Sequence, residues 1–507
     1  MLLRLIILSG IIFLSGNNAV SQVLPKDNDT LNYRLVGFQV PENKNATAYQ
    51  LEVYEFLAQD DGNVEKLVLK KTYERNRIIE TVPQFGKSYK WQVKYLKNSQ
   101  VIGSSGFHYF STGYSETVDT SKYRLKVLEN KVKDPDIYLV LDFISVIYDL
   151  DGNPLWYLPN IPVVADKNIQ MRDLKPTADG TFTAVSGQGA HEFDYNGKIL
   201  WTAANDGTVS GAQNESYHHE FTKLSNGHFM VCGQEPLLKK VPGFVDTAML
   251  NTARVEWHDD EECYYVNLKA ETLIEYDSNG RVVWYWKSSE HCSDKDFFRQ
   301  GANKMTKINT DMHMNAFEFD EKEKVIYISF KNTNQIVKIE YPSGKIIESY
   351  GINSDKKQDN PDTLFYGQHC IRKTKDGRLY LFNNNSRVLN MNRDEDHGEN
   401  TSISYITMLK ENPEKRSGIE KIWEFPCNID TFAMWAGGAG GSVTMLDNGD
   451  ILASMGAASR VFIVTPDKKV LWNGIPQVSD PGNNWHLLGQ YRTSYITKKD
   501  LNKFIYK

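Results

Sequence analysis

The stretch FDYNGKILWT at residues 193–202 recurs in altered form as YDSNGRVVWYW at residues 276–286. Each copy has a turn with glycine and a basic residue, followed by an apolar run with an aromatic residue. A turn followed by a short apolar run is typical of a β-strand. Further copies lie at residues 149–157, 341–351, 415–425 and 465–474. Six copies of one strand-like element predict a fold built from repeats.

A second element, a strand pair around an Asp-Gly or Asn-Gly turn, follows most of these copies. It occurs at residues 175–185, 222–232, 372–382 and 444–454, with a looser copy at residues 317–329. Such turns between short strands are the strongest local signal for a β-hairpin. Repeats built only from strands predict a propeller, because each four-stranded blade must cover its neighbour. We therefore expect an all-β chain with a six-bladed β-propeller at residues 120–500, closed by a strand from residues 487–499.

The N-terminal part of the chain lacks these repeats. Residues 31–115 alternate between polar and apolar residues, which predicts a small β-sandwich of the fibronectin type ahead of the propeller. Long segments also separate the propeller repeats, and we expect them to form loops or small additions on its faces. They lie at residues 203–216, 233–270, 287–310, 352–367 and 387–404.

Residues 1–21 contain one basic residue and a short apolar stretch, with the sequence Ala-Val-Ser just before Gln22. This order is typical of a cleaved secretory signal peptide, and an uncleaved N-terminal anchor is the alternative. No later stretch is long and apolar enough to span a bilayer. We therefore expect a periplasmic or secreted protein with no membrane span after signal cleavage.

Composition narrows the classes of partner. The 507 residues carry a formal net charge of −6 and a pI of about 6.1, which gives no general attraction to nucleic acid or anionic membranes. An oxidising compartment would allow one or two disulfides and leave at least one thiol over. The five cysteines are Cys232, Cys263, Cys292, Cys370 and Cys427. Their pairing stays open, as does assembly into a homodimer.

Three histidines share one position relative to the hairpin turns. His219, His313 and His369 each lie seven residues before the first residue of their turn. The same count reaches Arg172 in the first repeat, and Gly441 in a glycine-rich run that would leave room for a ligand. This position is near the start of the innermost strand of each blade, and innermost strands line the central channel. We therefore expect the three imidazoles to converge at one mouth of the channel.

Two kinds of chemistry fit such a cluster. Neutral imidazoles could hold zinc or copper with an open coordination position. They could instead handle an anion, with one histidine as nucleophile and the others as hydrogen-bond donors or proton carriers. No carboxylate shares the register, whereas Asn315 follows His313 by two residues and points to the same side of its strand. Because amide, ammonium and imidazolium groups all donate hydrogen bonds, chemistry on a tetrahedral anion is favoured.

Residues 311–346, beginning DMHMNAFEF, resemble the Asp-x-x-His-x-Asn segment of bacterial arylsulfate sulfotransferases that use no nucleotide sulfate donor, although the Asp stands one residue closer to the His. Residues 217–231, 367–386 and 442–472 resemble other segments of that family. The similarity covers most of residues 120–495. It implies a six-bladed propeller and an N-terminal β-sandwich, in agreement with the pattern of repeats.

The resemblance also implies a reaction. In that family a phenolic sulfate ester donates a sulfuryl group to a histidine, and a second phenol accepts it, which gives ping-pong kinetics. By position the sulfated residue matches His369, and the supporting residues match His219, His313 and Asn315. Lys331 stands where the family has arginine, which keeps the charge but loses the fixed two-donor fork. No metal, nucleotide or flavin cofactor is expected.

A phenol also needs an apolar wall and a cationic neighbour. We expect the substrate-binding residues to be Arg172, Phe365, Tyr366, Trp435 and Trp485. Two other functions stay open: a non-catalytic propeller that acts as a binding module, and a metal-assisted hydrolase or lyase of the propeller type. The shared register of three histidines argues against the binding module, which has no need of it.

Overall fold

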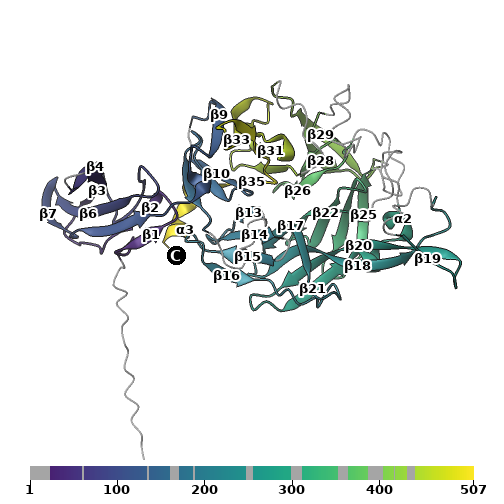
Figure 1. Cartoon of the computed structure of the whole chain (residues 1–507). Coiled ribbons are helices and arrows are strands. Elements are labelled where there is room, and N and C mark those ends of the chain that lie inside the picture. Colours follow the sequence, from purple (N-terminus) through teal and green to yellow (C-terminus); the bar gives the residue numbers. More distant parts are fainter. Residues whose placement is uncertain are drawn as a thin grey trace, which may run out of the picture. The chain divides into compact units, whose positions relative to one another are not determined.

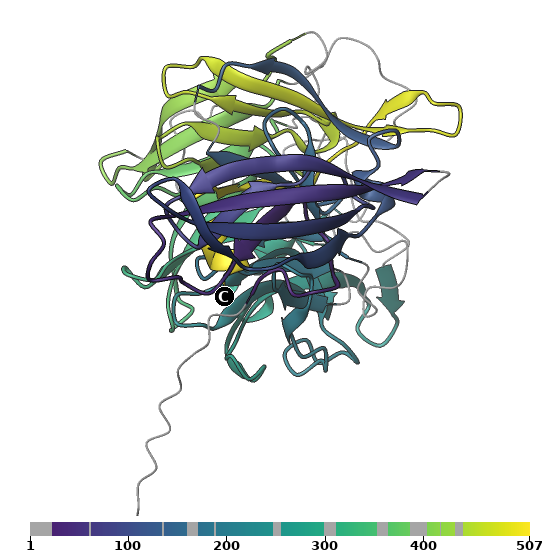
Figure 2. The same cartoon turned by 90° about the vertical axis from the view of Figure 1, so that its left-hand side faces the viewer.

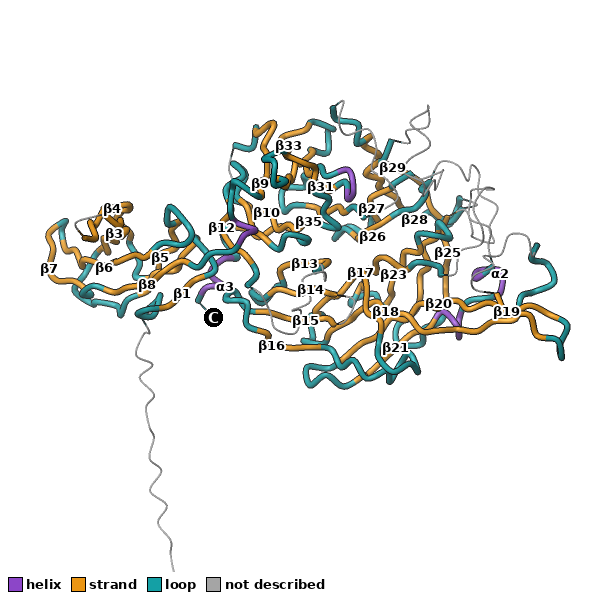
Figure 3. Tube along the Cα trace, viewed as in Figure 1, coloured by secondary structure: helices purple, strands orange, loops and turns teal. Residues whose placement is uncertain are grey.

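The structure is a computed structural model in which two compact units are distinguished, Met1–Gly113 and Tyr114–Lys507. It describes residues 23–59, 62–133, 136–159, 171–186, 189–246, 255–298, 311–351, 364–385, 403–415, 417–430 and 440–506. The signal peptide predicted at residues 1–21 lies outside these ranges. Strands dominate both units, and the helical segments are short (Figure 3).

The first unit is a β-sandwich of two sheets. In the larger sheet the strands lie in the order β1-β8-β6-β3-β4, with β7 also on β6, and β2 pairs with β5 in the smaller one (Figure 2). The strands are β1 (Asp29–Leu31), β2 (Leu35–Gln39), β3 (Ala48–Gln59), β4 (Gly62–Tyr73), β5 (Arg77–Thr81), β6 (Ser88–Lys97), β7 (Gln100–Ser104) and β8 (His108–Thr112). The two sheets meet where Phe38 on β2 packs edge-on against Trp91 on β6, with ring centroids 5.1 Å apart.

In the described part of the second unit, the strands form six sheets ranged around a common centre (Figure 1). The first sheet contains β10 (Ile137–Leu141), β11 (Val146–Tyr148), β12 (Pro154–Tyr157) and β35 (Thr493–Thr497). The second contains β13 (Arg172–Pro176), β14 (Phe182–Ser186), β15 (Gly189–Phe193) and β16 (Ile199–Thr202). The third contains β17 (Ser216–Lys223), β18 (Phe229–Lys240), β19 (Val255–His258), β20 (Cys263–Tyr276) and β21 (Val282–Lys287).

The remaining sheets follow the same plan. The fourth contains β22 (Met314–Asp320), β23 (Val325–Phe330), β24 (Gln335–Glu340) and β25 (Ile346–Gly351). The fifth contains β26 (His369–Lys373), β27 (Leu379–Asn383), β28 (Tyr405–Glu411) and β29 (Ile419–Pro426). The sixth contains β30 (Ser442–Met445), β31 (Ile451–Ser454), β32 (Val461–Val464), β33 (Val470–Ser479), β34 (Trp485–Leu487) and β9 (Tyr123–Asn130). The short helices are α1 (Ser288–His291), α2 (Asp294–Phe297) and α3 (Leu501–Ile505).

The sheets close into a ring. The inner strands β13, β17, β22, β26, β30 and β35 contact one another in cyclic order. The C-terminal strand β35 pairs antiparallel with β10, from Ile137 opposite Thr497 to Leu141 opposite Thr493. The prediction that the tail supplies a strand to the first blade is therefore confirmed, and the second unit is a six-bladed β-propeller.

In several blades the aromatic residue of the repeated element joins one blade to the next. Trp156 of the first blade donates its indole N–H to the carbonyl of Tyr195 in the second, at 2.6 Å. Trp472 of the sixth blade donates to the carbonyl of Leu150 in the first, at 2.7 Å. Both acceptors lie in the turn of the same element one blade further on. The aromatic residue recurs because a buried indole N–H needs an acceptor, and the neighbouring turn provides one.

One segment differs from its prediction. The segment 233–270 was predicted as a loop or small addition, but residues 233–240 and 263–270 within it are strand, since β18 pairs with β20 from Phe229 opposite Tyr276 to Lys240 opposite Tyr265. Buried and exposed residues alternate along the outer half of β20, so a simple two-residue period extends the blade outward. Residues 233–270 lack the Asn-Gly and Asp-Gly turns that mark the other hairpins, so their strands gave no clear sequence signal.

Two negative findings concern the described residues. No helix within them is long and apolar enough to cross a membrane. All five cysteines are free thiols, three of them buried. The disulfides that an oxidising compartment would allow are therefore not formed in this structure.

Candidate active site

A cavity of about 570 Å³ lies where the inner strands of several blades begin. Its polar lining includes Arg172, His219, His313, Lys331 and His369, which come from four different blades. The three histidines that share a sequence register therefore border one cavity. This brings together side chains that are up to about two hundred residues apart in the chain.

The imidazole rings lie close to one another and to a tyrosine. The rings of His219 and His313 are 4.8 Å apart between centroids and inclined at 74°. Tyr491 lies edge-on to both His219, at 5.5 Å, and His369, at 6.3 Å. A small anion placed among these rings would be within reach of several nitrogen atoms at once.

Equal spacing from the turn does not give the histidines equal backbone conformations. His219 lies inside a bulge of β17 with φ of 59°, and His313 has φ of 61° just before β22. In β26 it is instead Cys370, the residue after His369, that takes the left-handed conformation, with φ of 57°. Bulges re-aim side chains at functional sites, and here they turn residues at the start of inner strands toward the cavity.

His369 is almost fully buried and its tautomer is fixed by its partners. Its Nδ1 lies 2.7 Å from Oδ1 of Asn384 and 3.0 Å from the carbonyl oxygen of Gly367. The amide nitrogen of Asn384 donates to the carbonyl of Gly440 at 2.9 Å, which turns its oxygen toward the imidazole. Because both neighbours are acceptors, Nδ1 carries the proton and Nε2 keeps its lone pair.

Two of the cavity histidines, His369 and His219, are held neutral. Burial lowers the pKa of His369 well below its usual value, and the Lys331 ammonium lowers it further. Burial likewise lowers the pKa of His219, with added repulsion from His218 and His313. A neutral imidazole with a free lone pair is a nucleophile, whereas an imidazolium is not.

His313 has two charged neighbours, Lys331 in the cavity lining and Asp311 outside it. The backbone N–H of Lys331 donates to the carbonyl of His313 at 3.0 Å. Burial lowers the pKa of Lys331, and the nearby Asp311 carboxylate opposes that shift. Oδ1 of Asp311 lies 3.5 Å from Nδ1 of His313. Asp311 stands before the strand, where side chains do not alternate with a period of two residues. The register of the histidines therefore could not locate this carboxylate.

Several predicted residues do not border the cavity. Asn315 is fully buried and donates its amide to the carbonyl of Gln368 at 2.6 Å, so it supports the strand that begins at His369. Phe365 and Tyr366 are buried in the protein core, 1% and 5% exposed. None of these three side chains is among the residues that line the cavity, so their contact with substrate stays a prediction.

Of the other two predicted aromatic residues, the structure describes Trp485 and not Trp435. Trp485 lies on β34, where the guanidinium of Arg124 covers its ring at 3.8 Å, and it does not border the cavity. Trp435 lies outside the described residues. Gly441 does not open space for a ligand either, because a Cβ there would lie 2.2 Å from the Phe382 ring.

The aromatic wall is made by residues that the sequence analysis missed. Phe143 and Tyr491 stack with centroids 6.4 Å apart and planes 19° apart, and both line the cavity. Within the described part of the chain, the Tyr491 hydroxyl is buried with no hydrogen-bond partner. Tyr491 directly precedes β35, so the ring-closing tail was the signal that could have located it.

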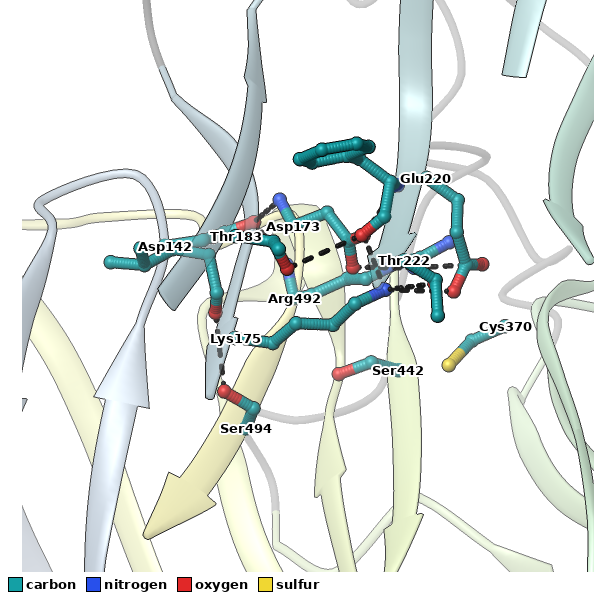
Figure 4. Close-up of polar contacts among 12 residues, drawn as sticks. Asp142, Asp173, Lys175, Thr183, Glu220, Thr222, Cys370, Ser442, Arg492 and Ser494 are labelled. Atoms are coloured by element: carbon teal, nitrogen blue, oxygen red, sulfur yellow. Dashed lines mark hydrogen bonds and ion pairs between the residues drawn. The ribbon is translucent and has the colours of Figure 1, made fainter. Parts of the chain in front are cut away.

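A layer of charged side chains lies next to residues of the cavity lining, and Figure 4 shows Asp173, Lys175, Glu220 and Arg492 among them. Arg492 reaches Asp173 at 2.6 Å and Glu220 at 3.0 Å. Lys175 and Arg372 also pair with Glu220, at 3.0 Å and 2.7 Å. These residues are mostly buried, so the layer is a network of ion pairs inside the propeller rather than a solvated surface.

This charged layer separates two cavities. A second cavity of about 350 Å³ is lined by Asp173, Lys175, Arg372 and Arg492, and shares no lining residue with the first. In three places, consecutive residues face opposite cavities: Arg172 and Asp173, His369 and Cys370, and Tyr491 and Arg492. The histidine cavity is therefore closed on its inner side by the charged layer.

The arrangement was compared with known proteins. The family model described as Arylsulfotransferase (ASST) matches residues 129–461. None of the curated proteins compared with this chain matches it. Among solved structures, a protein of unknown function from Bacteroides caccae is 11% identical, with a TM-score of 0.37, and covers 74% of this chain and 99% of its own. A virginiamycin B lyase from Staphylococcus aureus is 12% identical, with a TM-score of 0.34, and covers 68% and 87%.

Proposed function

This chain belongs to the arylsulfotransferase (ASST) family, and we propose that it transfers a sulfuryl group between phenols through a sulfated His369, with no nucleotide donor. The observation that carries the proposal is the environment of His369. Its Nδ1 proton is held by Asn384 and Gly367, so Nε2 is left as a neutral nucleophile in a residue that lines the cavity.

In the first half-reaction, Nε2 of His369 attacks the sulfur of a phenolic sulfate ester. The N–S bond forms as the bond from sulfur to the phenolic oxygen breaks, and the sulfuryl group stays on the imidazole. In the second half-reaction a phenol oxygen attacks the same sulfur and His369 is released. Two displacements at one site give ping-pong kinetics. The closed inner side of the cavity supports this order, because donor and acceptor would follow one another through the same approach.

The other polar side chains stabilise the charge that builds up on the sulfuryl oxygens. Lys331 and Arg172 supply positive charge at the cavity wall, and the unpartnered Tyr491 hydroxyl is a further donor. Donors fixed in a site with little water stabilise a transition state more than water does. The stacked rings of Phe143 and Tyr491 supply the apolar surface that a phenol needs.

The test is an assay with 4-nitrophenyl sulfate, with and without an added phenol. We expect nitrophenol release that depends on the phenol, together with formation of the new phenyl sulfate. Release into water at the same rate without a phenol would identify a sulfatase. No release under any condition, with the protein folded, would contradict the proposed transfer.

Lys331 gives a sharper test of the anion site. We expect Lys331→Ala to lower kcat for transfer about 100-fold, the effect of removing one oxyanion donor. Lys331→Arg should keep most of the rate, because the charge stays and two fixed donors are gained. Lys322→Ala, at a side chain that is 91% exposed, is the matched control and should leave kcat unchanged. Wild-type kcat for Lys331→Ala would exclude Lys331 from the site.

A further inference from the structure

Sulfuryl transfer from the ester of a basic phenol needs a proton at the phenolic oxygen as it leaves, and a proton must be taken back from the accepting phenol. His219 lines the cavity and is close enough to His313 and Tyr491 to serve the leaving oxygen. Burial holds the pKa of His219 well below its usual value, so a charged imidazolium is disfavoured at that ring. The proton must therefore be stored elsewhere while the enzyme waits for a donor.

A second histidine lies directly behind His219. Nδ1 of His219 and Nδ1 of His218 are 2.7 Å apart, so one proton is shared between them. On the far side of that ring, Nε2 of His218 lies 3.2 Å from Oε2 of Glu271. His218 is not part of the cavity lining, and the side chain of Glu271 is fully buried. The three groups form a line that leads from the cavity into the third blade.

Glu271 is held in place from two directions. Its Oε1 accepts the backbone N–H of His313 at 2.9 Å and the side-chain amide of Gln234 at 3.3 Å. Its other oxygen is the one that faces His218. The carboxylate thus ties the positions of two site histidines together, and a buried carboxylate stabilises a proton on the imidazole next to it.

We propose that His218 and Glu271 form a proton relay that serves His219, a role that rests on the proposed sulfuryl transfer. At rest His218 is protonated on both nitrogens and faces the Glu271 carboxylate, while His219 is neutral with its proton on Nε2. When the phenolic oxygen leaves, it takes the Nε2 proton of His219. The Nδ1 proton of His218 moves at the same time to Nδ1 of His219.

After this step both imidazoles are neutral and Nε2 of His219 holds a lone pair. The accepting phenol then gives its proton to that lone pair, and the shift between the two rings runs backward. No proton is lost to water, and His219 is never an imidazolium. The other charged groups near the pair are Asp311, beside His313, and Arg172 and Lys331 on the cavity side.

The structure offers a matched control in the same blade. His228 contacts Glu275 through Nδ1 at 2.7 Å, and Glu275 is as buried as Glu271. Neither His228 nor Glu275 lines the cavity. The variants His218→Gln and Glu271→Gln can therefore be compared with His228→Gln, which removes a similar pair that has no path to the substrate.

The experiment measures single-turnover sulfation of the enzyme with a series of aryl sulfates whose phenols differ in basicity. We expect His218→Gln and Glu271→Gln to slow transfer from phenyl sulfate at least about 100-fold, the usual size of a lost proton transfer. Transfer from 4-nitrophenyl sulfate should fall no more than about threefold, because nitrophenolate leaves without a proton. His228→Gln should follow the wild type on every donor. An equal loss on all donors would overturn the relay.

A second measurement does not depend on turnover. In nitrogen-labelled protein at neutral pH, we expect the signal of His218, identified by its loss in His218→Gln, to show protons on both nitrogens. The same histidine should become singly protonated in Glu271→Gln and stay unchanged in His228→Gln. A singly protonated His218 in the resting wild-type protein would overturn the relay, whether or not the protein transfers sulfuryl groups. Failure of all transfer with a doubly protonated His218 would instead count against the proposed function.

Discussion

His369→Ala is expected to lower sulfuryl transfer at least about a thousandfold while leaving the propeller folded. The nucleophile is the one group whose loss removes the covalent intermediate altogether, so no neighbouring donor can replace it. His369 is on an inner strand, where alanine removes a ring that packs mainly against the cavity and Tyr491. Its hydrogen bonds to Asn384 and Gly367 are local, so we expect the thermal unfolding midpoint to shift by only a few degrees.

The measurement combines rate and chemistry. After brief exposure to an aryl sulfate, mass analysis of the wild type should find a sulfuryl group on the peptide that contains His369, and on no peptide of the variant. His191→Ala is the matched control, because His191 is 2% exposed on β15 and does not line the cavity. It should keep its transfer rate even if it loses stability. Wild-type turnover in His369→Ala, or sulfation of another histidine, would contradict the assignment.

The ring of blades could be predicted because the same strand element and the same hairpin turns recur along the sequence. Each copy of the strand element places a turn beside the aromatic residue of the preceding blade, as with Trp156 and Tyr195, so the pattern reports a contact as well as a strand. The hairpin turns also fix where each inner strand begins. Counting back from those turns was enough to find His219, His313 and His369.

The number of residues between a histidine and its turn could not predict how a β-bulge changes the direction of the side chains. A count of residues assumes a regular strand, yet His219 takes a left-handed conformation inside its bulge while His369 does not. The count back from the turn singles out His219 and passes over its neighbour His218 for this reason. Which residue of such a pair faces the cavity depends on backbone angles that the sequence pattern does not contain.

The apolar wall could not be predicted for a different reason. Aromatic residues in loops carry no periodic signal, so Phe365 and Trp485 were as plausible as any others. Tyr491 and Phe143 meet only because the last strand of the chain joins the first blade. Contacts of this kind depend on ring closure, and they become visible only when the two ends of the propeller are placed side by side.

Ring closure also brings Arg492 into the centre of the propeller. We expect Arg492→Met to destabilise the propeller by about 3–5 kcal/mol, the usual cost of removing one partner of a buried ion pair. The guanidinium joins Asp173 to Glu220 and donates to the carbonyl of Asn315 at 2.7 Å. Burial acts to raise the pKa of Glu220, but Arg372 and Arg492 outweigh it and keep the carboxyl ionised. Methionine fills similar volume but leaves Asp173 and Glu220 short of positive charge.

The free energy of unfolding, measured by denaturant titration, checks this expectation against Arg378→Met. Arg378 is 38% exposed and pairs with Asp376 at the surface, so its loss should cost less than about 1 kcal/mol. Adding Asp173→Asn to Arg492→Met should restore part of the stability, because it removes one of the two carboxylates left without a partner. A loss below about 1 kcal/mol in Arg492→Met would show that the charged layer does not hold the inner strands together. A large loss would mean that the layer which closes the inner side of the active-site cavity is also a main source of the propeller's stability.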